Sequence, residues 1–253
     1  MRARVEIRGL WVSHRALHRN GLRRGEPRWA LRDLSLVVAA GEQLGVVGAN
    51  GAGKSTLLQA IAGVFPPTRG DVRTHGRVAS VGGEWSTLHR DLSGDEGLLF
   101  EGVVAGLSRR ELRRRRDAIA EFAELPDGVL SAPLFTYSAG MQARLGIALA
   151  LHADLDVLLV DEVLAAGDAP FREKCMDRID QIRAGGAAVV IVSHDLDLVR
   201  ERCDRALLLD AGVMRFLGSP REAVALHRGS TAAGIPAAAP AVAGSRRRTG
   251  ALR

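Results

Sequence analysis

The sequence predicts an α/β protein in which helices flank a mainly parallel sheet, and three observations support this fold class. Short apolar segments alternate with helix-like segments along most of the 253 residues. Hydrophobic residues make up 47% of the chain and charged residues 25%, as in ordinary globular proteins. No apolar stretch approaches the ~18 residues of a membrane-spanning helix. The longest runs, such as 187–192, have the length of a buried strand.

The expected strands are short, largely apolar runs bounded by polar residues or glycine. In chain order they are residues 5–7, 34–38, 43–47, 78–81, 157–160, 187–192, 206–209 and 213–216. Asp210-Ala211-Gly212 separates the last two runs, so we expect these two strands to form a hairpin.

The expected helices begin at residues that can cap a helix N-terminus. Ser108 and Glu111 form a capping box, Ser138 is a suitable N-cap, and Ser219 is followed by Pro220 at the first helical position. The expected helices are 55–62, 108–124, 138–152, 170–183 and one that begins at about 219.

The domain organisation follows from the order of these elements. The helices at 108–124 and 138–152 interrupt the strands, so we expect a helical lobe at about 86–153 inserted into one folded domain, 1–228. Residues 229–253 are mostly Ala, Pro, Gly and Arg, with almost no large apolar side chain. We expect this tail to be disordered, because it cannot bury enough apolar surface to offset the entropy of ordering.

Net charge is +6, and much of the excess lies in local arginine runs at 109–110, 113–116 and 246–248. Runs of like charge are usually solvated faces, and aromatic side chains that could stack on bases do not interleave with these runs. We therefore expect no nucleic-acid partner.

A glycine-rich loop between an expected strand and an expected helix carries the strongest chemical signal. It reads Gly48-Ala49-Asn50-Gly51-Ala52-Gly53-Lys54-Ser55-Thr56 and fits the pattern Gly, four residues, Gly-Lys-Ser. Glycines allow the loop to turn backbone N–H groups inward, and the helix N-terminus adds positive potential. Lys54 is expected to reach the β- and γ-phosphates of a nucleotide and Ser55 to ligate Mg²⁺. The structural alternative is a plain strand-to-helix turn.

Polar residues follow two of the apolar strands. Asp161 and Glu162 follow 157–160, where Asp161 suits a water-mediated Mg²⁺ contact and Glu162 can polarise a water for attack on the γ-phosphate. His194 follows 187–192 and is expected to hydrogen-bond the γ-phosphate and hold that water. The alternatives are a buried strand that ends in two acids and a structural histidine.

Ser138 and Gly140 lie where a helix begins and form a second candidate anion site. One triphosphate does not need two such sites on one chain. We therefore expect this helix end to meet the nucleotide held by a second copy, with a plain N-cap as the alternative.

These motifs, in this order, resemble those of the nucleotide-binding subunit of an ABC transporter over about residues 3–227. Walker A corresponds to 48–56, the signature to 137–142, Walker B to 157–161, the D-loop to 165–168 and the switch histidine to His194. The resemblance implies a P-loop NTPase core with an antiparallel β lobe and the inserted helical lobe.

Finer features are similar to those of the branch that exports lipid-linked polysaccharides, such as O-antigen, capsule and teichoic acid. They are Tyr-Ser-Ala-Gly-Met at 137–141, the run 161–171 with Lys174-Cys175 behind it, the segment 76–94, and Trp-Ala-Leu at 29–31.

Two positions depart from the superfamily pattern. Glu84 stands where the superfamily usually has the Q-loop glutamine, and a carboxylate there can still ligate Mg²⁺. The aromatic residue that stacks on adenine is unclear: His14 aligns best, with Trp11 and Trp29 as rivals, and all three could serve packing alone.

The resemblance implies an enzyme that hydrolyses ATP with Mg²⁺ and drives export of a lipid-linked polysaccharide or glycolipid. It implies a homodimer that forms on ATP binding and a separate integral membrane permease, so we expect the chain at the cytoplasmic face of the cell membrane. The rival is a soluble ABC-type ATPase that acts on nucleic acid or ribosomes. The net positive charge of the chain slightly favours this rival.

Overall fold

The computed structural model describes residues 2–14, 28–81, 91–161 and 167–233. Its strands are β1 (Ala3–His14), β2 (Arg28–Ala39), β3 (Gln43–Val47), β4 (Arg69–Thr74), β5 (Val78–Val81), β6 (Val157–Val160), β7 (Ala188–Val192), β8 (Arg205–Asp210) and β9 (Val213–Gly218). Its α-helices are α1 (Lys54–Ile61), α2 (Gly94–Val104), α3 (Arg109–Phe122), α4 (Ala139–His152), α5 (Ala169–Ala184), α6 (Leu196–Arg202) and α7 (Pro220–Ala233). Two short 3₁₀ helices, η2 (Val129–Ser131) and η3 (Leu134–Thr136), precede α4.

The described strands form two sheets. The larger has six strands in the order β5-β6-β7-β3-β8-β9, in which every pair from β5 to β8 is parallel and β9 pairs antiparallel with β8. The smaller is antiparallel, in the order β2-β1-β4. Every residue of β3, β6 and β7 is buried. This explains why β6 and β7 are continuous apolar runs and why β3 is apolar after Gln43.

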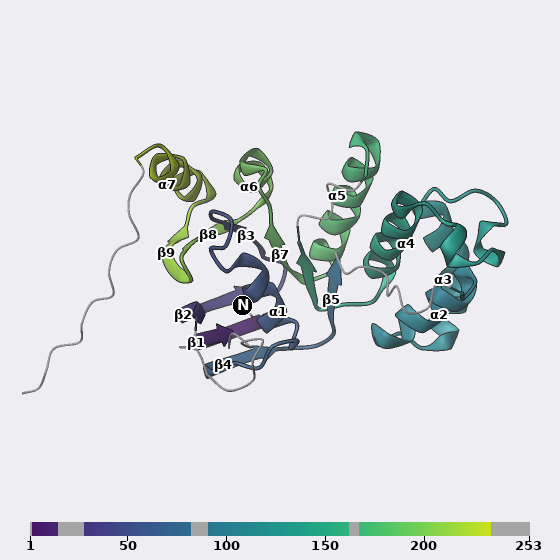
Figure 1. Cartoon of the computed structure of the whole chain (residues 1–253), viewed down its shortest axis with the longest axis horizontal. Helices are drawn as coiled ribbons and strands as arrows, with labels where there is room; N and C mark the ends of the chain where they lie inside the picture. Colours follow the sequence, from purple (N-terminus) through teal and green to yellow (C-terminus); the bar gives the residue numbers. More distant parts are fainter. Residues whose placement is uncertain (1, 15–27, 82–90, 162–166, 234–253) are drawn as a thin grey trace, which may run out of the picture.

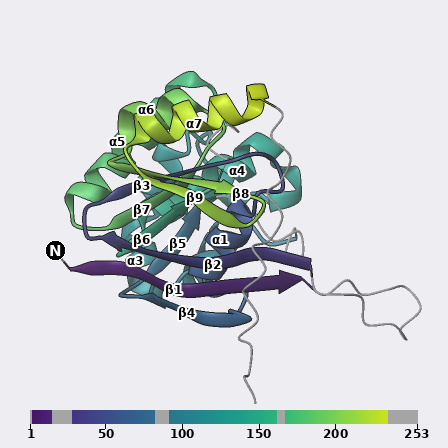
Figure 2. The same cartoon turned by 90° about the vertical axis from the view of Figure 1, so that its left-hand side faces the viewer.

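Helices cover both faces of the larger sheet. Helix α1 lies between the two sheets, while α5, α6 and α7 cover the opposite face (Figure 1, Figure 2). One core cluster joins α1 to the inward faces of both sheets. Two further clusters lie on the other face, one with α4 and α5 and one with α6 and α7. The α/β core with an antiparallel β lobe is thus confirmed.

The inserted helices form a lobe with a core of their own. The side chains of α2, α3, η2, η3 and α4 share one buried cluster, which includes Leu98, Leu112 and Leu145. Helix α4 joins the lobe to the larger sheet, because Leu145 faces the lobe while Leu151 packs in the cluster with α5. The start expected for this lobe, at about residue 86, lies outside the described residues.

Strands β1 and β2 are longer than the expected 5–7 and 34–38, and three elements and part of the tail also differ from the sequence expectations. We did not expect β4, α2 and α6: β4 is polar and largely exposed, and α6 has only seven residues. Helix α2 begins at a capping box, Ser93 with Glu96, so a usable signal was present. The prediction of disorder from residue 229 is wrong for 229–233, which continue α7. The composition of 229–253 indicated only that little apolar surface could be buried. Extension of an existing helix by one residue adds a backbone hydrogen bond without a new nucleation cost, so α7 can continue to residue 233.

Candidate nucleotide site

The loop that follows β3 needs glycine at two of its positions. Gly53 has φ 105°, and a Cβ there would lie 2.6 Å from the carbonyl oxygen of Ala30. A Cβ on Gly48 would lie 2.1 Å from the carbonyl oxygen of Leu209. The loop is therefore wedged between β2 and β8, and side chains at these positions would push it out of place.

The turn of the β8–β9 hairpin holds this loop from behind. The Gly212 N–H donates to the carbonyl oxygen of Ala52 at 2.9 Å, and the Arg32 N–H donates to the carbonyl oxygen of Gly212 at 2.7 Å. The sequence predicted the hairpin, but it gave no sign that this turn fixes the phosphate loop.

Lys54 is buried within the loop, with 6% of its surface exposed. Its Nζ donates to the carbonyl oxygens of Gly48 at 2.8 Å and Ala49 at 3.2 Å. Burial of an ammonium group costs free energy unless an opposite charge or strong acceptors compensate it. A buried ammonium inside a glycine-rich loop at the start of α1 has the charge and position to bind phosphate oxygens.

The carboxyl ends of the parallel strands bring the other expected residues to the same edge of the sheet. Strands β6, β7 and β3 are consecutive neighbours and parallel, so Asp161, His194 and the loop before Lys54 all follow strands at that edge. The Asp161 N–H donates to the carbonyl oxygen of Val81 at 3.2 Å. His194 is exposed there. The predicted base Glu162 and the predicted metal ligand Glu84 both lie outside the described residues.

A histidine that the sequence analysis did not single out belongs to the same neighbourhood. His227 lies on α7, and burial, followed by the nearby charges of Lys54 and His194, lowers its pKa. The charges of Lys54 and His194 thus both act on the His227 side chain. No motif marks His227, because α7 arrives at the site from the far end of the chain.

Comparison with known families agrees with this geometry. A family model described as ABC transporter matches residues 31–165, which is about half of the chain and includes the loop, Ser138 and Asp161. The chain belongs to the ABC transporter family.

Curated relatives of this ABC chain carry names from polysaccharide export. The chain is 38% identical to the O-antigen export system ATP-binding protein RfbB of Klebsiella pneumoniae, over 82% of the chain and 84% of that protein. It is 40% identical to RfbB of Myxococcus xanthus over 79% of the chain, and 39% identical to the teichoic acids export ATP-binding protein TagH of Lactiplantibacillus plantarum over 79%. The chain spans about half the length of these last two proteins, 45% and 54%.

Solved structures show the same fold. The dimeric structure of a post-hydrolysis state of the ATP-binding cassette MJ0796, bound to ADP and Pi, has a TM-score of 0.72 at 23% identity. The alignment covers 86% of this chain and 99% of the cassette. This likeness confirms the predicted ABC ATPase fold.

The signature segment of this ABC chain lies at the N-terminus of α4, away from Lys54. Ser138 caps the helix by accepting a hydrogen bond from the Met141 N–H at 3.1 Å, and both Ser138 and Gly140 are exposed. Figure 1 shows α4 in the helical lobe, on the other side of β5 from α1. One chain therefore does not bring the two expected anion sites together.

Both rival candidates for the adenine-stacking residue have structural partners in the antiparallel lobe. Trp11 and Trp29 meet edge to face with ring centroids 5.2 Å apart, and the Arg69 guanidinium lies within 5.8 Å of both rings. These contacts favour a packing role for both tryptophans. His14 ends β1, and its side chain is outside the described part of the structure.

Proposed function

We propose that this chain hydrolyses ATP and thereby drives export of a lipid-linked polysaccharide or glycolipid through a separate membrane permease. The observation that carries the ATPase proposal is the buried Lys54 ammonium in its glycine-rich cradle, at the sheet edge that Asp161 and His194 share. The export proposal is supported by relatives named for O-antigen and teichoic acid export.

Phosphoryl transfer requires positioning and charge neutralisation more than covalent chemistry. Lys54 and the backbone N–H groups of the loop hold the phosphates and orient the γ-phosphate. Glu162 accepts a proton from the attacking water, and His194 holds that water in line. These roles make Glu162 the residue on which turnover depends most strongly.

The oxygen donors near the phosphate loop fit a magnesium ion. Ser55 is exposed in the first turn of α1, Asp161 ends β6, and both offer the hard oxygen ligands that Mg²⁺ prefers. Glu84 is a third candidate ligand. The ion would neutralise charge on the β- and γ-phosphates.

The functional unit in this proposal is a homodimer that closes on ATP. Ser138 and Gly140 are exposed at the N-terminus of α4, a helix of the lobe that Figure 1 shows on the other side of β5 from α1. In a head-to-tail pair, this end would contact the nucleotide of the partner. Closing and reopening of the pair would then deliver work to the permease.

The permease is a separate partner in this proposal, and the chain works at the cytoplasmic face of the membrane. Among the described helices, none combines the length and apolar character that a membrane crossing requires. The cargo and the permease rest on the names of relatives rather than on a pocket in this chain.

Replacement of Glu162 tests the enzymatic part. We expect Glu162→Gln to bind ATP, form dimers that gel filtration detects, and lose turnover, because an amide is not a base. Hydrolysis at the parent rate would contradict the assignment of Glu162.

Deletion of the gene tests the export part. We expect lipid-linked polymer to accumulate inside the cell, and Glu162→Gln to fail to restore export. Normal surface glycan together with loss of another exported compound would reject the polysaccharide cargo and leave the ATPase proposal standing. Co-purification with nucleic acid instead of a permease would favour the soluble ATPase.

A further inference from the structure

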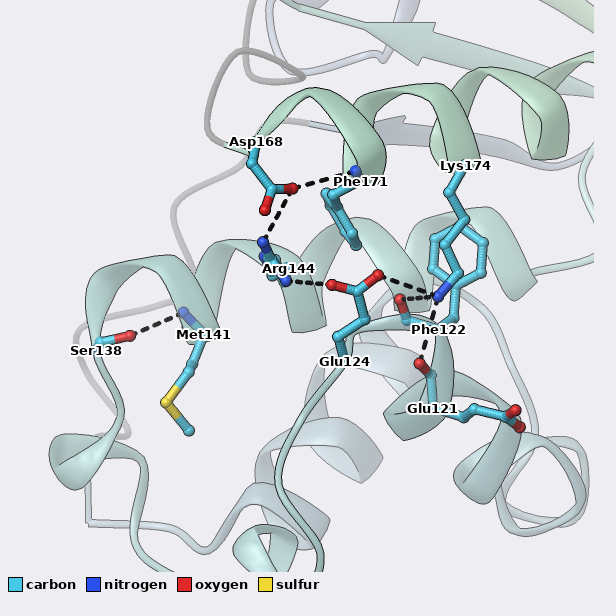
Figure 3. Close-up of polar contacts among 9 residues, drawn as sticks. All are labelled: Glu121, Phe122, Glu124, Ser138, Met141, Arg144, Asp168, Phe171 and Lys174. Atoms are coloured by element: carbon cyan, nitrogen blue, oxygen red, sulfur yellow. Dashed lines mark hydrogen bonds and ion pairs between the residues drawn. The ribbon is translucent and has the colours of Figure 1, made fainter.

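A polar cluster joins the end of α3, the second turn of α4 and the start of α5 (Figure 3). Its centre is Arg144, whose side chain is 23% exposed. The Arg144 Nη1 donates to Glu124 Oε2 at 2.5 Å, and Nη2 lies 3.2 Å from Asp168 Oδ1. The guanidinium carbon also lies 4.7 Å from the ring centroid of the buried Phe171. This side chain of α4 thus contacts two other segments, the end of α3 and the start of α5.

Each partner of Arg144 is itself held in place. Asp168 Oδ1 also accepts the Phe171 N–H at 3.1 Å and so caps α5. Glu124, which ends α3 with φ 56°, also lies 3.5 Å from the Lys174 Nζ. The position of Arg144 relative to α3 and α5 is therefore fixed from both sides.

The cluster lies between two parts of the proposed catalytic machinery. Arg144 follows Gly140 by one helical turn, so it moves with the exposed N-terminus of α4. Asp168 and Gly167 end the stretch of chain that begins at Asp161 and includes Glu162. Gly167 packs tightly there, because a Cβ on it would lie 2.5 Å from the Phe171 ring.

We propose that Arg144 is a positioning residue for ATP hydrolysis, which fixes the signature end of α4 against Asp168 and Phe171 at the start of α5. This inference rests on the proposed function, in which Ser138 and Gly140 contact the nucleotide of a partner copy. Engagement of that nucleotide would displace α4, and the Arg144–Asp168 ion pair would carry the displacement to Asp168, which follows Glu162 by six residues in the sequence. The residue thus acts on turnover and not on the binding of ATP to the phosphate loop.

The test compares Arg144→Met with a matched arginine elsewhere in the lobe. Arg115 is similarly covered, with 27% of its side chain exposed, and it joins α3 to the end of α4 through Asp154 and the carbonyl oxygen of His152. Arg115→Met should lower the melting temperature about as much as Arg144→Met and keep the parent kcat. Arg144→Met should lower kcat by about 10- to 100-fold, the effect of a displacement of about 1 Å near the chemistry. Its affinity for a fluorescent ATP analogue should stay within about threefold of the parent.

Two further variants separate positioning from folding. Asp168→Asn keeps a good cap for α5 and removes the charge that Arg144 contacts, so kcat should fall while the melting temperature changes little. Arg144→Lys should recover only part of kcat, because an ammonium cannot bridge two carboxylates and stack on Phe171 as a planar guanidinium does. The positioning role is wrong if Arg144→Met or Asp168→Asn keeps the parent kcat. It is also wrong if Arg115→Met lowers kcat as much as Arg144→Met does. A parent chain without ATPase activity would refute the proposed function and this inference together.

Discussion

Replacement of Lys54 by methionine should weaken ATP binding strongly and change the stability of the nucleotide-free protein little. Methionine keeps an unbranched apolar stem and removes the ammonium group. In the structure the Lys54 Nζ donates to the carbonyl oxygens of Gly48 and Ala49, at 2.8 and 3.2 Å, and the residue is 6% exposed. The two consequences of the substitution therefore have different origins and can be measured apart.

The loss in affinity follows from the charge-assisted hydrogen bonds between Lys54 and the phosphates. Such a bond contributes about 1.5–3 kcal/mol, and every ~1.4 kcal/mol is a factor of ten in Kd. One lost bond thus predicts an affinity about 10- to 150-fold lower. For the free protein, loss of the two bonds to carbonyls is offset by relief of the cost of burying a charge. We expect the melting temperature to shift by less than about 4 °C, which corresponds to about 1 kcal/mol for a chain of this size.

The assay is titration with a fluorescent ATP analogue, accompanied by thermal melting without nucleotide. Lys174→Met is the matched control, because it makes the same substitution at the second lysine, outside the nucleotide site. It should bind the analogue as the parent does. If Lys54→Met binds within about threefold of the parent and melts normally, Lys54 does not hold the phosphates.

Three other outcomes are expected. A mixture of Lys54→Ala and Ser138→Arg subunits should recover part of the ATPase activity that each lacks alone, since a mixed dimer keeps one intact composite site; no recovery in demonstrated mixed dimers would count against a site shared between chains. Tyr137→Phe should lower the free energy of unfolding by about 1–2 kcal/mol in chemical denaturation, because the buried Tyr137 hydroxyl donates to the carbonyl oxygen of Val129 at 2.7 Å; an unchanged midpoint would contradict this. Burial lowers the pKa of His152, so the unfolded chain binds a proton there first, and stability should fall as the pH drops below about 6.5. His152→Gln should remove that part of the pH dependence, and an unaltered profile would show that another group causes it.

Local sequence signals were sufficient for most of the elements. The bounds of β3, β5 and β6 agree with the prediction, because each is a short, largely apolar segment between residues typical of turns and loops. Ser108 and Ser138 cap α3 and α4 as expected, since a capping side chain acts within one helical turn. Asp161 and His194 lie at the same edge of the sheet. Their placement also follows from local signals, once β6 and β7 are known to be parallel.

Contacts between distant parts of the chain had no such signal. The bond from Gly212 to Ala52 joins residues far apart in the chain, and neither residue type indicates the other. The pairing of Arg144 with Glu124 and Asp168 depends on how α3, α4 and α5 pack, which periodicity does not specify. The roles of all the candidate site residues stay predictions, and those of Glu162, Glu84 and His14 rest on motifs alone.

The two lysines illustrate how such contacts select a side chain. Of the 35 basic residues only Lys54 and Lys174 are lysines, and both donate to main-chain carbonyl oxygens of two consecutive residues. Lys174 does so at Glu121 and Phe122, where the carbonyls at the end of α3 favour a positive charge. A compact ammonium has three donors and can bind carbonyl oxygens that point toward one spot from a tight backbone turn. A guanidinium is planar and larger, so it fits such a spot less well. At Lys54 the converging carbonyls belong to the glycine-rich loop itself, so in the proposed nucleotide site the same geometry that selects lysine would place its charge beside the phosphates.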